Sequence, residues 1–181
     1  MKTPHRSAVE LEFLAELFYP SLRELGEFEE VGEDELPPLY GKLLAHDQHM
    51  TLAVESHHGC PIDVEVRKSC RTPTHYQRNS LLTRQSDGRV VLFAIMRAAL
   101  SLLSPAVRQE IESEQIPLGR ILIEHNVLRK VRLLSLWKVI PTVTLREAFR
   151  LDRLEVCYGR TALIYCDAVP VMELLEVVTA D

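Results

Sequence analysis

The fold of this chain is decided by residues 75–97, which read HYQRNSLLTRQSDGRVVLFAIMR. Two runs rich in strand-forming residues, 75–85 and 90–97, flank the pair Asp87-Gly88, and this arrangement is a strong signal for a β-hairpin. A further strand is expected just before it, because residues 62–67 alternate apolar and charged side chains at the period of a half-buried strand. Together these strands predict an antiparallel sheet.

The rest of the main body supplies further strands and short helices. The first expected helix has Asp47 as its N-cap, passes through Val54 and stops near His58-Gly59. Three more helices are expected: from Ser104-Pro105 to about Glu114, from Pro117 to near Asn126, and over 145–149. The expected strands are 127–140, 156–166 and 170–178, with a turn at Asp167-Ala168 between the last two. The order of these elements predicts an α+β fold: a single domain with an antiparallel sheet of about six strands, and helices that pack on it.

The first 35 residues differ in charge from the rest of the chain. Residues 1–35 hold ten acidic and three basic side chains, a net of −7, whereas residues 36–181 hold sixteen and eighteen, a net of +2. We expect an acidic helical extension over 1–35, with a helix at 8–18 and an exposed Glu-rich connector at 27–35. The main domain is expected over 36–181.

Composition argues against several classes of function. The longest apolar run, Val90–Met96, is far short of the roughly 20 residues that span a bilayer, and no apolar signal core opens the chain. The four cysteines are then best interpreted as reduced thiols. No basic face favours nucleic acid, and no glycine-rich loop favours a nucleotide. We therefore expect a cytoplasmic protein, monomer or homodimer, whose partner is a small anionic molecule.

Five of the seven histidines fall between residues 46 and 75, which raises the question of a zinc site. His46 and His49 could share a helix face, and His57 is close in sequence. No HExxH or CxxC spacing accompanies them, however. Surface or capping histidines are the favoured interpretation, and neither a metal nor any other cofactor is expected.

Four features of the sequence point to one family. They are HDQHMT at 46–51, YQR at 76–78, PLGR at 117–120, and a last strand that contains Glu176. Their order and spacing resemble chorismate lyases (chorismate–pyruvate lyases), in particular the compact bacterial relatives, over about residues 36–178. The resemblance implies a cofactor-independent enzyme that converts chorismate to 4-hydroxybenzoate and pyruvate, as a precursor of ubiquinone or of a secondary metabolite. It also implies that helices packed on the sheet cover an internal ligand pocket, as flaps over the ligand.

The resemblance assigns roles to four residues. Met50 and Leu118 would bind the substrate, the first through its main chain and the second through its backbone N–H. Arg78 and Glu176 would bind the substrate and carry catalysis, Arg78 at the ring carboxylate and Glu176 near C4, where it would assist proton removal. The residue types suit this chemistry, because the planar fork of arginine gives a carboxylate two charge-assisted hydrogen bonds. Gly119 is expected to permit close approach of the ligand.

Alternation leaves the choice of glutamate open. Glu176 shares a face with Met172, Leu174 and Val178, whereas Glu173 shares the other with Val171, Leu175 and Val177, and both faces are apolar. The family pattern favours Glu176. Two other functions also remain: a non-catalytic domain of the same fold that senses aromatic acids, and a related enzyme that makes a different hydroxybenzoate.

Overall fold

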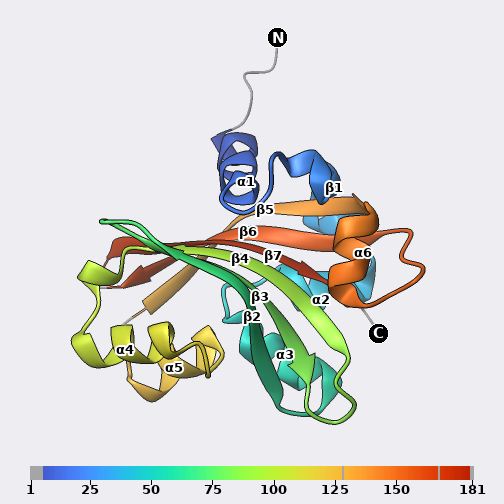
Figure 1. Cartoon of the computed structure of the whole chain (residues 1–181). Helices are drawn as coiled ribbons and strands as arrows, with labels where there is room; N and C mark the ends of the chain where they lie inside the picture. Colours follow the sequence, from blue (N-terminus) through green and yellow to red (C-terminus); the bar gives the residue numbers. More distant parts are fainter. Residues whose placement is uncertain (1–5, 128, 167, 180–181) are drawn as a thin grey trace.

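The computed structural model describes residues 6–127, 129–166 and 168–179, in which helices cover both faces of one sheet (Figure 1). The elements are α1 (Arg6–Glu16), η1 (Leu22–Glu24), β1 (Gly26–Val31), η2 (Glu33–Glu35), α2 (Pro38–Leu44), α3 (Met50–His58), β2 (Ile62–Arg71), β3 (Tyr76–Arg84), β4 (Val90–Ala98), η3 (Leu100–Leu102), α4 (Pro105–Ser113), α5 (Leu118–Glu124), β5 (Arg129–Pro141), α6 (Val143–Phe149), β6 (Cys157–Cys166) and β7 (Val169–Val178). Among the described residues, no helix is long and apolar enough to cross a membrane.

The sheet confirms the expected α+β class. Its strands follow the order β1-β5-β6-β7-β4-β3-β2, and every neighbouring pair is antiparallel. The hairpin predicted around Asp87-Gly88 joins β3 to β4, with Gly88 at φ 72°. Of the turn predicted at Asp167-Ala168, Ala168 lies in a turn between β6 and β7, and Asp167 lies outside the described residues. The described part of the sheet has seven strands, one more than the approximate number expected.

The additional strand is β1, so the exposed connector expected at 27–35 is wrong. Gly26–Val31 pairs with β5 at the edge of the sheet. Phe28 packs edge-on against Trp137, with 6.5 Å between ring centroids, and Val31 joins a second apolar cluster. Glutamates at the other positions face solvent, as charged side chains on an edge strand commonly do.

The helices at the start of the main domain also differ from expectation. Helix α2 was not foreseen, and the N-cap of α3 is His49 instead of Asp47. Asp47 does not cap because its Oδ1 accepts a hydrogen bond from the Leu133 backbone N–H, at 3.4 Å. The predicted cap of α4 is confirmed: Ser104 Oγ accepts from the Val107 backbone N–H, also at 3.4 Å.

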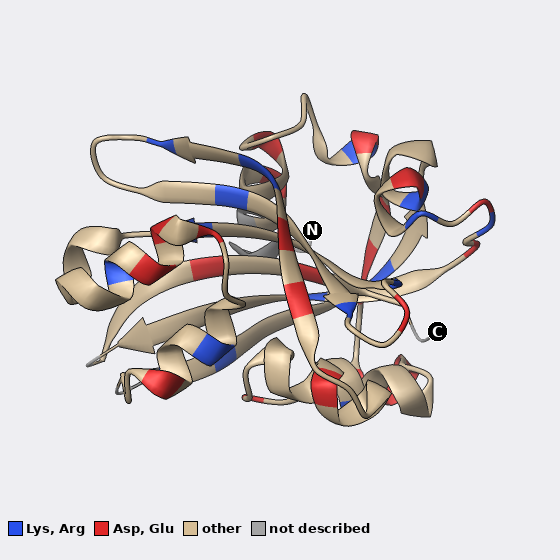
Figure 2. Ribbon diagram, turned by 60° about the horizontal axis from the view of Figure 1, so that its bottom comes forward, with Lys and Arg blue, Asp and Glu red and all other residues tan. Residues whose placement is uncertain are grey.

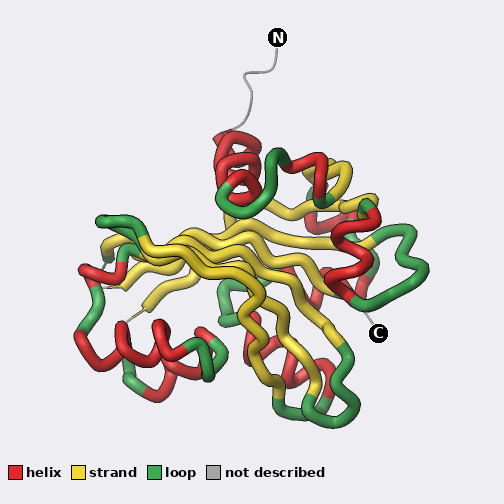
Figure 3. The backbone as a smooth tube through the Cα atoms, viewed as in Figure 1, coloured by secondary structure: helices red, strands yellow, loops and turns green. Residues whose placement is uncertain are grey.

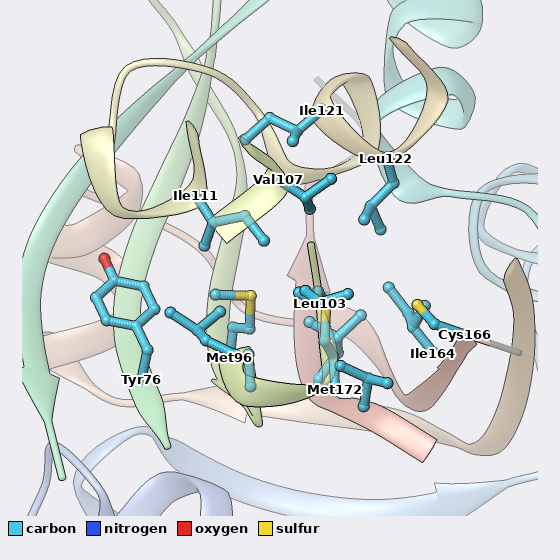
Figure 4. Packing of buried hydrophobic residues seen from close by; sticks show 14 of the residues in the cluster. Tyr76, Met96, Leu103, Val107, Ile111, Ile121, Leu122, Ile164, Cys166 and Met172 are labelled. Carbon is cyan, nitrogen blue, oxygen red and sulfur yellow. The ribbon is translucent and has the colours of Figure 1, made fainter. Parts of the chain in front are cut away.

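Three apolar clusters hold the helices on the sheet. On one face, α1 and α6 cover a continuous cluster that includes Leu14, Phe93, Trp137, Leu145 and Leu175. On the other face, α4 and α5 pack over one end and α2 and α3 over the other (Figure 3). Figure 4 shows side chains of α4 and α5 meeting those of the sheet at the first of these two ends.

Charged residues lie mostly outside these clusters. Figure 2 shows Lys and Arg scattered among Asp and Glu over helices and strands alike. Several form local pairs, such as Arg84 Nη2 with Asp87 Oδ2, at 2.5 Å across the turn of the β3–β4 hairpin. Three charged residues are exceptions, because Arg78, Arg160 and Glu176 are buried on the face covered by α2–α5.

Two glycines provide a matched test of the backbone. Gly59 ends α3 at φ 64°, and a methyl group there would meet no atom within 4 Å, as is also true of Gly41 inside α2. Gly59→Ala should lower the free energy of unfolding by about 1–2 kcal/mol, because alanine is strained in the left-handed region. Gly41→Ala should raise it by up to about 1 kcal/mol through helix propensity. Urea unfolding measures both, and equal effects would contradict the assignment of Gly59 as a left-handed cap.

Candidate functional site

A pocket opens on the sheet face that α2–α5 cover. Its cavity volume is about 40 Å³ for the centres of water-sized molecules, and the empty space around it, open solvent included, is about 530 Å³. The floor comes from β3, β4, β6 and β7, and the starts of α3 and α5 form walls. The lining residues are His49, Met50, Thr51, Arg78, Ser80, Leu82, Leu92, Ala94, Met96, Leu118, Gly119, Val131, Arg160, Ile164, Leu174 and Glu176.

Strand register brings the polar floor residues together. Ser80 pairs with Ala94, Ala94 with Glu176, and Glu176 with Arg160, so these residues form one row across four strands. Arg78 lies two residues from Ser80 along β3 and therefore points to the same face. Because the side chain of Ala94 is short, the pocket floor is deepest at the middle of this row. The larger polar side chains lie on either side of Ala94.

The structure places all four sequence-predicted site residues on this one pocket. Met50 begins α3, Leu118 begins α5, Arg78 lies in β3 and Glu176 in β7.

Of the two glutamates that alternation left open, Glu176 is the one that lines the pocket. It is only 7% exposed. Glu173 is outside the pocket lining and pairs with Arg97, with 2.7 Å between Nη1 and Oε2.

Arg78 is buried in the pocket with unused hydrogen-bond donors. It is 3% exposed, and its Nε and Nη1 atoms have no partner among the described residues. Burial lowers the pKa of Arg78, and the neighbouring Tyr76 and Glu114 oppose that shift. A buried guanidinium with free donors is matched in charge and geometry to a carboxylate that enters from the pocket.

A hydrogen-bonded chain connects Arg78 to the protein surface. The Tyr76 hydroxyl donates to Glu114 Oε1 at 2.6 Å. Burial, with this bond, raises the pKa of Tyr76 to about 12, so the phenol stays protonated. The same bond, helped by one from Ser69, lowers the pKa of Glu114. The negative charge that acts on Arg78 is that of Glu114, which is hydrogen-bonded to Tyr76. The pocket side of the guanidinium therefore remains open to a ligand.

Arg160 is a charged pocket residue that sequence reasoning missed. It is 1% exposed, and Nε donates to Glu176 Oε2 at 2.7 Å. The turn predicted at Asp167-Ala168 would place residue 160 opposite residue 175. A register shift between Ile164 and Tyr165 brings Arg160 opposite Glu176 instead, and this shift has no signal in the sequence.

His46 belongs to the surroundings of Arg160. Its Nε2–H donates to the Leu43 carbonyl at 2.7 Å, while Nδ1 accepts from the Gln48 backbone N–H at 3.1 Å and from Arg160 Nη1 at 3.3 Å. Burial and then Arg160 lower the pKa of His46, which favours the neutral ring that these bonds require. Within the described ranges, no three His, Cys, Asp or Glu side chains are grouped so as to hold a metal ion.

Gly119 lines the pocket and also lies against α3. A Cβ atom at this position would lie 2.6 Å from Thr51 Oγ1 and 3.1 Å from His49 Cβ. The glycine therefore allows α5 to approach α3, and the close approach of a ligand expected from the sequence stays a prediction. An ion pair between Arg120 and Glu55 joins the same two helices. Residues at the two helix starts thus form a joint wall of the pocket.

The sheet order and the helices define an α+β domain with a partly polar pocket on one sheet face. Known bacterial structures share this fold, although no family model and no curated protein matches the sequence. PhnF from Mycobacterium smegmatis matches with a TM-score of 0.53 and 11% identity, over 72% of this chain and 63% of PhnF. YydK from Bacillus subtilis, described as a possible transcriptional regulator, matches with a TM-score of 0.51 and 12% identity, over 65% of this chain and 57% of YydK. The gene product SA0254 from Staphylococcus aureus matches with a TM-score of 0.50 and 10% identity, over 75% and 90%.

The two buried arginines should respond oppositely to the same substitution. Arg78→Met removes a buried charge without a full set of partners, so it should raise the free energy of unfolding by about 1 kcal/mol or more in the absence of ligand. Arg160→Met leaves Glu176 buried without its partner, so it should lower that free energy by about 3–5 kcal/mol. Urea unfolding at pH 7 compares the two variants. A loss of stability in Arg78→Met as large as that in Arg160→Met would show that Arg78 is paired within the protein.

Proposed function

We propose that the pocket binds a small aromatic carboxylic acid, with its carboxylate on Arg78. The observation that carries the proposal is the buried guanidinium of Arg78, whose Nε and Nη1 atoms find no partner among the described residues. Burying a cation is costly unless an anion compensates it, and a bidentate carboxylate does so with the matching geometry. The floor beside Arg78 is apolar and suits a ring; it includes Leu82, Leu92, Met96, Ile164 and Leu174.

A second polar group narrows the ligand class. Glu176 lies in the same pocket, two strands away from β3, and as a carboxylate it accepts hydrogen bonds but does not donate them. A ring that carries a carboxylate at one end and a hydroxyl at the other would satisfy both residues. Hydroxybenzoates have this form, and the resemblance to chorismate lyases points to the same class of ligand.

Binding is tested by calorimetry with 4-hydroxybenzoate. Arg78→Ala should weaken binding about tenfold or more, the equivalent of a charge-assisted hydrogen bond of about 1.5–3 kcal/mol. Arg78→Lys should recover only part of the loss, because an ammonium cannot reproduce the fork. Arg97→Ala, which removes an arginine that does not line the pocket, is the control. Unchanged binding in Arg78→Ala would overturn the proposed site.

Catalysis on chorismate is the second candidate function, and the position of Glu176 favours it. In the reaction the C4–H bond breaks, its electron pair forms the C3–C4 double bond, and the C3–O bond breaks to release enolpyruvate, which takes up a proton to become pyruvate. Aromatisation drives the step, so the protein needs a proton acceptor near C4 and a fixed ring. In this candidate Glu176 is the acceptor and Arg78 fixes the ring.

Turnover separates the candidates when chorismate is added and the products are identified by chromatography. Pyruvate with 4-hydroxybenzoate supports the lyase, and another hydroxybenzoate supports a related enzyme. Binding without turnover supports a sensing domain, a role to which the description of YydK lends some support.

If the lyase is correct, Glu176→Gln should lower the turnover rate by about 10²-fold or more, the usual scale for a general acid–base group. Binding of 4-hydroxybenzoate should weaken much less, because the contact of its carboxylate with Arg78 is untouched. Glu173→Gln is the matched control, since Glu173 is outside the pocket lining, and it should leave turnover nearly unchanged. Equal rates in the two variants would exclude Glu176 as the proton acceptor. Steady-state rates measured side by side provide the comparison.

A further inference from the structure

We propose that Arg160 is a positioning residue that fixes the hydroxyl-recognising end of the pocket by holding Glu176 and the segment 44–48 in one arrangement. The proposal deepens the proposed function and rests on it. Arg160 acts through Glu176 and the start of α3, and both of these line the pocket.

Every nitrogen of the Arg160 guanidinium donates to a protein acceptor. Nε donates to Glu176, while Nη1 and Nη2 reach the chain between α2 and α3. Nη1 donates to the His46 carbonyl at 2.9 Å and lies 3.4 Å from that of Leu44, and Nη2 donates to the Gln48 carbonyl at 3.1 Å. One side chain therefore joins a sheet carboxylate to three backbone carbonyls.

The carbonyl of Leu44 ends α2, and those of His46 and Gln48 belong to the connection between α2 and α3. The local hydrogen bonds there include those from the His46 N–H to the Leu44 carbonyl and from the Gln48 N–H to the His46 ring. Residues 45–48 are neither helix nor strand, so the guanidinium fills a role that regular backbone pairing would otherwise have. Gln48 directly precedes His49 and Met50, which start α3 and line the pocket. The position of this wall thus depends on a side chain that projects from β6.

The same side chain restrains Glu176. A glutamate has several rotatable bonds, and a contact through Oε2 limits its orientation while Oε1 remains for a ligand donor. Backbone packing supports the pair, because a Cβ at Gly159 would come within 2.7 Å of the Glu176 carbonyl oxygen. Glycine at this position lets β6 lie close to β7 beside the ion pair.

A positioning role predicts a loss of discrimination. Benzoate and 4-hydroxybenzoate share the carboxylate that Arg78 binds, and they differ in the hydroxyl that Glu176 would accept. In the unaltered protein, 4-hydroxybenzoate should bind about tenfold more tightly than benzoate. Arg160→Lys keeps the positive charge but cannot reach all of the acceptors of the guanidinium with one ammonium. The ratio of the two dissociation constants should fall to about threefold or less, while benzoate binding changes by less than about threefold.

Calorimetry with both ligands tests this on the full chain, with Arg97→Lys as the matched control. Arg97 makes a pair with Glu173 that has the same 2.7 Å separation but is outside the pocket, so its variant should keep the unaltered ratio. An unaltered ratio in Arg160→Lys, or an equal loss of both ligands, would overturn the positioning role alone. If the unaltered chain binds neither ligand, the proposed function fails and the inference fails with it.

A second measurement does not depend on the folding of an Arg160 variant. Hydrogen–deuterium exchange is followed in Glu176→Gln and in Glu173→Gln, without ligand. If Arg160 couples Glu176 to the segment, exchange over residues 44–50 should rise about tenfold or more in Glu176→Gln and stay unchanged in Glu173→Gln. Equal exchange over residues 44–50 in both variants would contradict the coupling.

Discussion

The buried ion pair between Arg160 and Glu176 is the interaction on which the pocket depends. Two opposite charges lie side by side on a sheet face that is otherwise largely apolar, with 2.7 Å between Nε and Oε2. Removing water from such a pair is costly unless further hydrogen bonds complete it, and the carbonyls of segment 44–48 supply them. The same bonds place the start of α3. One buried cation therefore sets both the floor and a wall of the pocket.

The contrast with Arg78 shows how one residue type serves two purposes on one sheet face. Every nitrogen of Arg160 has an acceptor within the chain, whereas Nε and Nη1 of Arg78 have none among the described residues. A buried arginine whose donors are all hydrogen-bonded stabilises a fixed arrangement. A buried arginine with unused donors gains favourable hydrogen bonds only when a ligand binds. The Tyr76–Glu114 contact provides a countercharge without filling the pocket. In our proposals, ligand recognition belongs to Arg78 and the arrangement of the pocket to Arg160, two arginines in different strands.

The sequence predicts those parts of the fold that follow local rules. The hairpin of β3 and β4 and the Ser104 cap are of this kind, because each is specified by neighbouring residues. The sequence does not predict strand β1, because its glutamates obscure the alternation of an edge strand. It predicts Asp47 as an N-cap, but the Asp47 carboxylate accepts a hydrogen bond from the distant Leu133 backbone N–H. The choice between Glu173 and Glu176 could not be made from alternation, since helices bury both faces of β7. Which face of β7 lines the pocket depends on how helices far away in the sequence pack on the sheet, and Glu176 lies on that face.

The N-terminal segment is acidic in composition, but its apolar residues are part of the continuous cluster beneath α1 and α6. Leu11, Leu14 and Leu25 are each at most 2% exposed and cover Phe93 and Leu175 on the sheet face opposite the pocket. A shortened chain beginning at residue 36 would lose this cover together with the edge strand β1. The apolar sheet face opposite the pocket would be exposed to solvent, and β5 would become an unpaired edge strand. Both features promote self-association. The acidic segment is therefore part of the folded domain. Shortened or fused versions of the protein need to keep it.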